Sequence, residues 1–326
     1  MKYFSALFLL AASTVFAPAQ ALPLLSLDST IKLPNVSGRI DHLAIDLARK
    51  RLFVAELGND TVDVIDLASR KVVHRIIGLD EPQGVLYLPA ADLVVVANGG
   101  DGTVRIFGGS DFGPRGQLKL AGDADNMRLD SRNGHIIVGY GSGGLAVIDA
   151  SKAVKLADIP LPGHPESFQL SEADSRLWVN IPDSRAIDVV DTAIPKVVAQ
   201  WRTAHSGNFP MAKDEKRHMI AVVYRGPPRL VLIDTNTGAS VSEIQACGDA
   251  DDVFFDKRRQ RYYVSCGVGK IDVVAAGSTG LQPAIELSVP SGGRTSLFVP
   301  ELDRIFVAVR AGVLGSEAEL QIYRPQ

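Results

Sequence analysis

The sequence has only two cysteines and few aromatic residues. Cys247 and Cys266 are the only cysteines among 326 residues, and phenylalanine, tryptophan and tyrosine together make up 6%. One cysteine pair in a chain of this length excludes a small disulfide-rich scaffold. Paired CxxC motifs are absent, as are HxH and HExxH, so no recognisable zinc motif is present.

A strong charge of either sign is also lacking. The chain carries 34 basic and 37 acidic residues, a formal net charge of −3. This balance argues against a general basic surface for nucleic acid, which we do not expect as a partner. Two short basic runs, KRRQR (257–261) and DEKRH (214–218), could form a local patch, although solvated turns are their ordinary explanation.

Long apolar runs are confined to the N-terminus. The chain begins with a lysine, an apolar run of about a dozen residues and the small-x-small pattern Ala19-Gln20-Ala21, which is typical of a secretory signal peptide. No later stretch approaches the ~20 apolar residues of a transmembrane helix. We therefore expect cleavage near Ala21, no membrane span, and a periplasmic or secreted protein comprising residues 22–326.

Two nearly identical segments reveal a repeat. GDADNMRLD begins at Gly122 and GDADDVFFD at Gly248, 126 positions later. Neither is an EF-hand calcium loop, because Met127 and Val253 stand where that loop needs an oxygen ligand. Since 126 is three times 42, a period of about 42 residues is expected. Equivalent strand ends follow one another in steps of 41 to 43 residues, at Asp46, Tyr87, Asp130, Ser171, Asp214, Asp256 and Val299.

Each unit contains short β-branched runs separated by turns, with no helical periodicity. The first runs include HLAID, NMRLD and DVFFD, and the second runs include RLFVAE, LVVVAN and RYYVSC. Four strands in each of seven units predict an all-β fold, a single seven-bladed β-propeller domain over residues 22–326. The last unit lacks its fourth strand, whereas Ser26–Pro34 forms an extra strand before the first unit. We expect this N-terminal strand to complete the last blade and close the ring.

The units also resemble the YVTN-type β-propeller repeat. The segment KRLFVAELGNDTVDVIDLASRKVVHRI (50–76) is similar to the pattern LYVTN, GxxTVSVID and K-V-[VI], and the similarity extends over the mature chain. No unit contains the literal YVTN, and FVAE, VVAN, IVGY, WVNI and YVSC stand in its place. The resemblance implies a bacterial, exported propeller of the lactonase/quinoprotein-like superfamily, but it says little about function.

The loops leading into the innermost strands are expected to gather at one mouth of the central channel. These loops contain a different polar side chain in almost every unit: Asp41-His42, Gln83, Asp125-Asn126, Glu166-Ser167, Asn208, Asp251-Asp252 and Arg294-Thr295. The loops after the second strands add Glu56, Asn98, Tyr140, Asn180, Tyr224-Arg225, Cys266 and Arg310. Such diversity at equivalent repeat positions indicates a binding site.

From these positions we predict ten ligand-binding residues: His42, Glu56, Gln83, Asn126, Glu166, Asn208, Asp251, Asp252, Arg294 and Arg310. Structural roles compete with this interpretation. Asp125, Asn126 and Asp251 could instead cap turns, and His42 could be a hydrogen-bonded channel residue. Cys247 and Cys266 are expected to form a disulfide beside this mouth, with two free thiols as the alternative.

Two functions fit this pattern. The first is a monomeric binding protein, without a cofactor, whose channel mouth captures a small polar ligand or a segment of a partner protein. The second is a calcium-dependent lactonase, in which a metal polarises a carbonyl. Its candidate ligands are Glu56, Asn126, Asn180 and Asp252, with His42 or Asp251 as the base.

Overall fold

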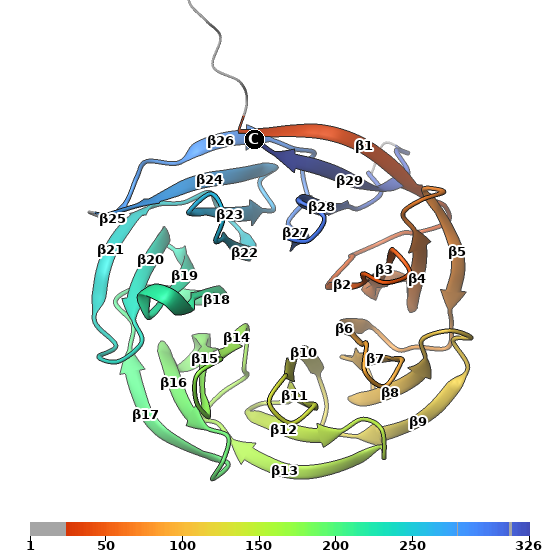
Figure 1. The fold of residues 1–326 in the computed structure, drawn as a ribbon, viewed down its shortest axis with the longest axis horizontal. Helices are drawn as coiled ribbons and strands as arrows, with labels where there is room; N and C mark the ends of the chain where they lie inside the picture. Colours follow the sequence, from red (N-terminus) through yellow and green to blue (C-terminus); the bar gives the residue numbers. More distant parts are fainter. Residues whose placement is uncertain (1–23, 279, 313–314) are drawn as a thin grey trace, which may run out of the picture.

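Seven antiparallel sheets form a ring around a central axis (Figure 1). The computed structural model describes residues 24–278, 280–312 and 315–326. The predicted signal peptide, residues 1–21, lies outside the described residues. The architecture is a seven-bladed β-propeller, so the predicted fold class is confirmed. In the described part of the chain, no helix is long and apolar enough to cross a membrane.

Within each blade the chain runs from the axis outwards. Blade 1 contains β2 (Leu43–Asp46), β3 (Arg51–Glu56), β4 (Thr61–Asp66) and β5 (Lys71–Ile76). Blade 2 contains β6 (Pro82–Leu88), β7 (Leu93–Asn98), β8 (Thr103–Gly108) and β9 (Pro114–Lys119). Blade 3 contains β10 (Ala124–Asp130), β11 (His135–Tyr140), β12 (Gly144–Asp149) and β13 (Val154–Pro160). Blade 4 contains β14 (Phe168–Leu170), β15 (Arg176–Ile181), β16 (Ala186–Asp191) and β17 (Lys196–Arg202).

Blades 5 to 7 follow the same order. Blade 5 contains β18 (Ser206–Asp214), β19 (Met219–Gly226), β20 (Pro228–Asp234) and β21 (Ser240–Gln245). Blade 6 contains β22 (Ala250–Asp256), β23 (Arg261–Cys266) and β24 (Lys270–Gly277), with its outer position divided between β25 (Gly280–Leu281) and β26 (Ile285–Ser288). Blade 7 contains β27 (Thr295–Val299), β28 (Arg304–Val309) and β29 (Ala318–Pro325). Single 3-10 turns are η1 (Leu57–Asn59), η2 (Pro182–Ser184) and η3 (Glu215–Arg217).

The ring is closed by the N-terminal strand. β1 (Leu25–Leu33) pairs antiparallel with β29, from Leu25 opposite Pro325 to Leu33 opposite Ala318. It supplies the fourth strand of blade 7, as the sequence predicts, so no blade is left open at the junction of the two ends. Closure removes two sheet edges that would otherwise offer unpaired backbone groups.

The core lies between blades rather than on the axis. Seven apolar clusters are found among the described residues, one at each junction of neighbouring blades. The largest fully buried side chains include Phe53, Trp178 and Tyr262. Because every blade is covered on both faces, its two middle strands are almost continuously apolar.

One alignment expected from the sequence is wrong by a residue. Asp46 pairs with Arg51 in blade 1, and its equivalent in blade 2 is Leu88, which pairs with Leu93. Tyr87 therefore lies one position early, because Tyr87 and Leu88 are both apolar strand residues and only the pairing of Leu88 with Leu93 identifies the last of them. With Leu88 as the strand end of blade 2, equivalent residues of the seven blades can be compared at the same depth along the channel axis.

Candidate functional site

One mouth of the channel is lined by a ring of seven equivalent residues, the mouth ring. Steps of 41 to 43 residues connect Asp41, Gln83, Asp125, Glu166, Phe209, Asp251 and Arg294. Five members of the mouth ring line a pocket of about 30 Å³ on the axis, and the same pocket is lined by Arg39, His42, Asn126, Ser167 and Asp252. Blades far apart in the sequence thus contribute to one small polar site.

The first half of this mouth is acidic and surrounds His42. Asp41 pairs with Arg39, with 2.8 Å between Oδ2 and Nη2. The His42 Nε2 atom lies 3.5 Å from Asp125 Oδ1 and 4.0 Å from Asp41 Oδ1. Although burial acts to lower the pKa of His42, contact with Asp125 and the charge of Asp41 raise that pKa to about 9. His42 is therefore a half-buried imidazolium at neutral pH.

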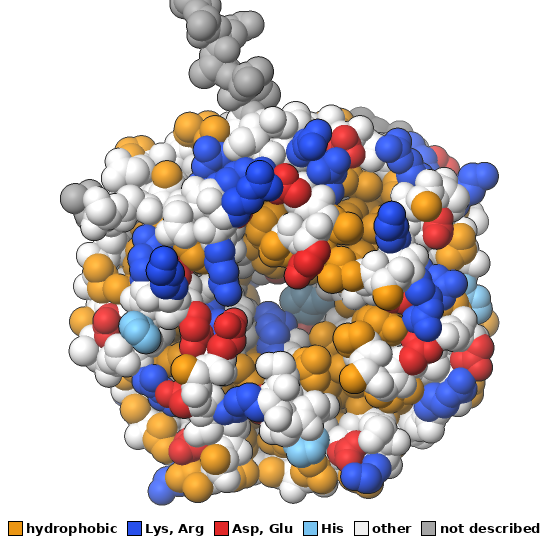
Figure 2. Space-filling view, viewed as in Figure 1, with side chains coloured by type: hydrophobic (Ala, Val, Ile, Leu, Met, Phe, Trp, Pro, Cys, Tyr) orange, Lys and Arg blue, Asp and Glu red, His pale blue; other side chains and the backbone are white. Residues whose placement is uncertain are grey.

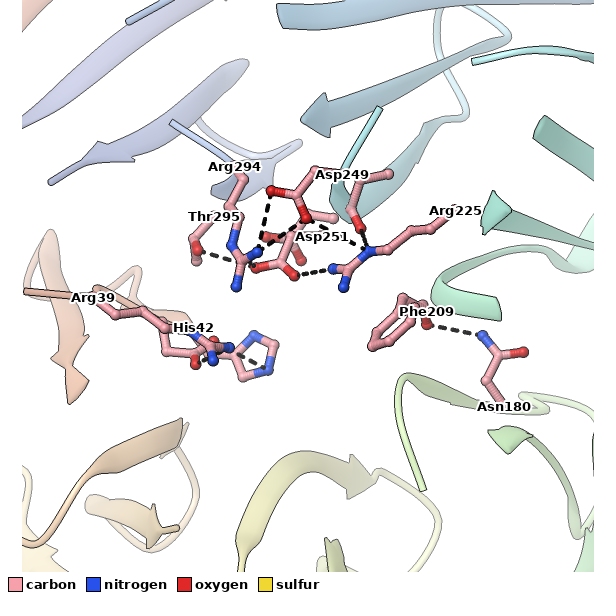
Figure 3. Close-up of polar contacts among 12 residues, drawn as sticks. Arg39, His42, Asn180, Phe209, Arg225, Asp249, Asp251, Arg294 and Thr295 are labelled. Atoms are coloured by element: carbon pink, nitrogen blue, oxygen red, sulfur yellow. Dashed lines mark hydrogen bonds and ion pairs between the residues drawn. The ribbon is translucent and has the colours of Figure 1, made fainter. Parts of the chain in front are cut away.

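The second half is a network of arginines around Asp251 (Figure 3). Asp251 accepts a hydrogen bond from Arg225 Nη2 at 2.7 Å and lies 3.1 Å from Arg294 Nε. Arg294 also bonds Asp249 at 3.1 Å. The Arg225 guanidinium lies 3.6 Å from the centroid of the Phe209 ring, in a cation–π contact. These contacts fix Asp251 in place and neutralise much of its charge.

Three carboxyl groups hold their protons unusually strongly. Burial raises the pKa of Asp41 to about 7 and that of Asp252 to about 6. Burial and the charge of Asp125 raise the pKa of Glu166 to about 7. Asp125 behaves in the opposite way, because His42 keeps its pKa below the usual value despite burial. Near pH 7 Asp41 and Glu166 therefore each carry only part of a negative charge.

Apart from Asp41 Oδ2, which is ion-paired with Arg39, two buried oxygen atoms of the axial pocket lack hydrogen-bond partners. Asp125 and Asn126 are 8% and 4% exposed, and Oδ1 of each has no hydrogen-bond donor among the described residues. Asp125 Oδ1 has only the 3.5 Å ion-pair contact with His42. Buried acceptors are ordinarily satisfied, so these two atoms are available for a donor group supplied from outside the protein.

Several predicted binding residues meet at this mouth. His42, Asn126, Glu166, Asp251 and Asp252 line the axial pocket. Asp252 is held by a 2.7 Å hydrogen bond from the Ser296 backbone amide. Of the remaining predicted residues, Arg294 contacts Asp251 as described, and Gln83 lies nearby, donating to Asp123 at 2.8 Å.

Other predicted residues do not line the axial pocket. Glu56 is fully buried beside Thr61 and Arg75 within blade 1, and Asn208 donates to Asn180 Oδ1 at 3.2 Å and to the Ala186 carbonyl. Asn98, Asn180 and Cys266 are likewise fully buried, and Tyr140 and Tyr224 are buried. The cause is strand geometry, since the last side chain of a second strand is enclosed between blades.

Arg310 lies in a second pocket, next to the axial pocket. It lines a pocket of about 140 Å³ together with Arg39, Arg294 and Asp249. Arg39 lines both this pocket and the axial pocket. The sequence therefore places Arg310 on the correct face but not on the axis.

The proposed calcium ligands do not assemble. Asn126 and Asp252 line the axial pocket, whereas Glu56 is held inside blade 1 and Asn180 donates to the Phe209 carbonyl at 2.9 Å. Within the residues described, no group of three or more His, Cys, Asp or Glu side chains is placed to hold a metal ion. Only Asn126 and Asp252 of the four residues expected as calcium ligands therefore line the axial pocket.

A disulfide joins Cys247 and Cys266, whose Cα atoms are 6.0 Å apart. It connects the segment before β22 to the end of β23. The enclosed segment carries Asp249, Asp251 and Asp252, so the bond braces part of the mouth.

The basic runs have mostly internal partners. Arg259 bonds Asp256 and Asp303, and Arg217 bonds Asp214. Lys257 and Arg258 are exposed at a hairpin turn. These contacts favour the structural interpretation of both runs.

Sequence reasoning missed two residues of the mouth. Phe209, rather than Asn208, is the blade 5 member of the mouth ring, which a count of 42 back from Asp251 would have indicated. Arg39 precedes the first innermost strand by four residues and has no equivalent in the repeat pattern. No sequence signal marked its ion pair with Asp41.

Replacing Glu166 with glutamine is expected to stabilise the protein at pH 8. The folded-state pKa of Glu166, about 7, lies above its ordinary value of 4.5. A raised carboxyl pKa stabilises the fold while the group is protonated, and this contribution is lost as the pH rises through 7. We expect Glu166→Gln to gain ~1–2 kcal/mol at pH 8 and almost nothing at pH 5.

Urea unfolding at both pH values measures this difference. The matched control is Glu301→Gln, an exposed carboxylate in the β27–β28 turn. Lower stability of Glu166→Gln at pH 8 would contradict the assignment of an uncompensated charge.

Comparisons with known proteins support the fold alone. No protein-family model and no curated protein matches the chain, so the YVTN resemblance stays a prediction. A chain in the crystal structure of the mitotic checkpoint complex is similar in structure, with a TM-score of 0.79 and 13% sequence identity. The similarity covers 99% of this chain and 98% of that chain. It shows the same propeller architecture.

Proposed function

We propose that the protein is an exported, YVTN-type binding protein whose channel mouth holds the ammonium group of a small polar amine. The observation that carries this proposal is the pair of buried, unpartnered oxygens on Asp125 and Asn126 beside Glu166 and Asp252. An ammonium group supplies both things that this site lacks, namely hydrogen-bond donors and positive charge.

The dimensions of the pocket support an ammonium group rather than a larger one. A volume of about 30 Å³ accommodates one or two water-sized groups. The rest of the ligand would lie outside, over the rim formed by Arg39 and Arg294. A guanidinium at the rim suits a hydroxyl or carboxylate on the same ligand.

Calorimetric titration with 4-amino-1-butanol tests the proposal, with 1,4-butanediol as the uncharged counterpart. We expect 4-amino-1-butanol to bind and butanediol not to bind. Glu166→Gln and Asp252→Asn should each weaken 4-amino-1-butanol binding by about tenfold or more, since each removes a charge-assisted contact. Glu301→Gln is the matched control and should bind as the parent does.

A second arm distinguishes a free amine from a lysine of a partner protein. Nα-acetyl-lysinamide presents its ammonium group as a protein segment would. Binding of this compound but not of 4-amino-1-butanol would assign the mouth to a protein partner and overturn the small-ligand proposal. Absence of binding by either compound at millimolar concentration would overturn the ammonium site itself.

A further inference from the structure

A larger cavity occupies the channel behind the mouth. It has a volume of about 500 Å³ and is lined by residues of all seven innermost strands and the loops beside them. His42, Ser167 and Asp252 line both this cavity and the mouth pocket, so they separate the two. Figure 2 shows the ring hollowed at its centre, with apolar, basic and acidic side chains around the opening.

One level of this cavity is formed by structurally equivalent residues. Counting in steps of 41 to 43 residues, the position held by Arg128 in blade 3 is held in the other blades by Ala44, Leu86, Gln169, Ala212, Phe254 and Leu297. All seven line the cavity. Arg128 is the only charged residue at this level, and five of its six equivalents are apolar.

Arg128 lacks a carboxylate partner within the protein. Its Nη1 donates to the Met127 carbonyl at 2.8 Å, and its Nη2 lies 3.5 Å from Ser167 Oγ. Among the residues that the structure describes, no carboxylate oxygen lies within 4.0 Å of its guanidinium. Burial lowers the pKa of Arg128, which reflects the cost of removing an arginine charge from water. An anion bound in the cavity would offset that cost.

The cavity and the mouth have opposite charge. The charged residues that line the cavity are four cations and two carboxylates, a formal balance of +2 with His42 protonated: His42, Arg128, Lys213, Lys257, Glu172 and Asp252. Lys213 also pairs with Glu215, 2.9 Å away. Two cations and five carboxyl groups line the mouth pocket, a formal balance of −3 that the raised pKa values of Asp41 and Glu166 reduce near neutral pH: Arg39, His42, Asp41, Asp125, Glu166, Asp251 and Asp252. A ligand suited to one compartment is therefore unsuited to the other.

We propose that this cavity is a second ligand site, which binds a small organic carboxylate with an apolar body, its carboxylate paired with Arg128. A guanidinium binds a carboxylate through two parallel hydrogen bonds. The walls beside Arg128, including Leu86, Phe254 and Leu297, suit an alkyl or aryl group. The volume lies within the range of small-molecule sites. This inference does not depend on the amine site.

Calorimetric titration with octanoate tests the inference, with octanamide as the uncharged counterpart of the same shape. We expect octanoate to bind the parent protein at least tenfold more tightly than octanamide does. Arg128→Gln should weaken octanoate binding by about tenfold or more and bring it to the level of octanamide. Arg70→Gln, which removes an exposed arginine in the β4–β5 turn, is the matched control and should leave octanoate binding unchanged.

A second variant tests the location without removing the charge. Leu86→Trp adds bulk at the level of Arg128 and should block octanoate while circular dichroism confirms the fold. Equal binding of octanoate to the parent and to Arg128→Gln, or no binding at millimolar concentration, would overturn the proposal. Glu166→Gln should bind octanoate normally, so failure at the mouth and failure in the cavity are distinguishable.

Discussion

Removal of residues 24–34 is expected to abolish the cooperative unfolding transition of the protein. These residues contain β1, which supplies the outer strand of blade 7 along eight paired positions. Leu25, Ile31 and Leu33 are fully buried, and their burial alone is worth ~5–9 kcal/mol. A loss of this size is comparable to the whole stability of an ordinary protein, ~5–15 kcal/mol. The truncated chain would also expose the edge of β29.

Differential scanning calorimetry of the truncated and parent proteins checks this expectation. A milder pair of variants controls for the loss of a terminus. Ile31→Ala should cost ~2–4 kcal/mol through the cavity that it leaves. Lys32→Ala, whose side chain is 59% exposed and pairs with Glu319, should cost less than ~1 kcal/mol. A truncated protein that melts as the parent does would refute closure by β1.

Loss of the Cys247–Cys266 disulfide is expected to have the next largest effect. The bond closes a loop of 19 residues, for which the chain-entropy relation predicts ~3 kcal/mol of stabilisation. We expect Cys247→Ala/Cys266→Ala to lower the melting temperature by several degrees.

The same variant is expected to weaken amine binding at the mouth. Asp249, Asp251 and Asp252 lie inside the braced loop, so loss of the bond would loosen them. Reduction of the parent protein with dithiothreitol should reproduce the change, and dithiothreitol should have no effect on the double variant. Unchanged melting in the double variant would contradict a stabilising role.

Much of the fold could be predicted from the sequence because a propeller repeats one local pattern. The 126-residue separation of Gly122 and Gly248 revealed the period, and the strand missing after β29 indicated closure by β1. The exact pairing of residues between neighbouring strands was harder to predict from the sequence. Tyr87 was aligned one place early because Tyr87 and Leu88 are equally suited to end the strand, and only the pairing of Leu88 with Leu93 decides between them.

The candidate site was only partly predictable for a related reason. His42, Glu166 and Asp252 could be identified because each is a polar residue just before an innermost strand or among its first residues. Glu56 and Asn208 are also polar residues near strand ends, but their side chains are enclosed between blades. The direction of a side chain at a strand end depends on how neighbouring sheets pack, which requires the three-dimensional structure.

Arg128 illustrates a signal that was present but not used. Its position within NMRLD resembles an ordinary alternating strand. Aligned with Ala44, Leu86, Phe254 and Leu297, however, it is a lone cation at a mostly apolar repeat position. A comparison of equivalent positions along the whole strand, rather than in the loops alone, would have identified it.

The pairing of β1 with β29 also determines the order in which the molecule can form. Ser26 and Gln326 are hydrogen-bonded across 300 positions of sequence, whereas strands within blades 1 to 6 pair with near neighbours. Blades 1 to 6 contain all their strands while the chain is still being synthesised, but blade 7 cannot be completed until β29 has left the ribosome. Such a long-range contact is among the slowest to form. The first strand to be synthesised, β1, therefore pairs only after the last strand, β29, is complete. A prematurely terminated chain would retain an open, aggregation-prone sheet edge.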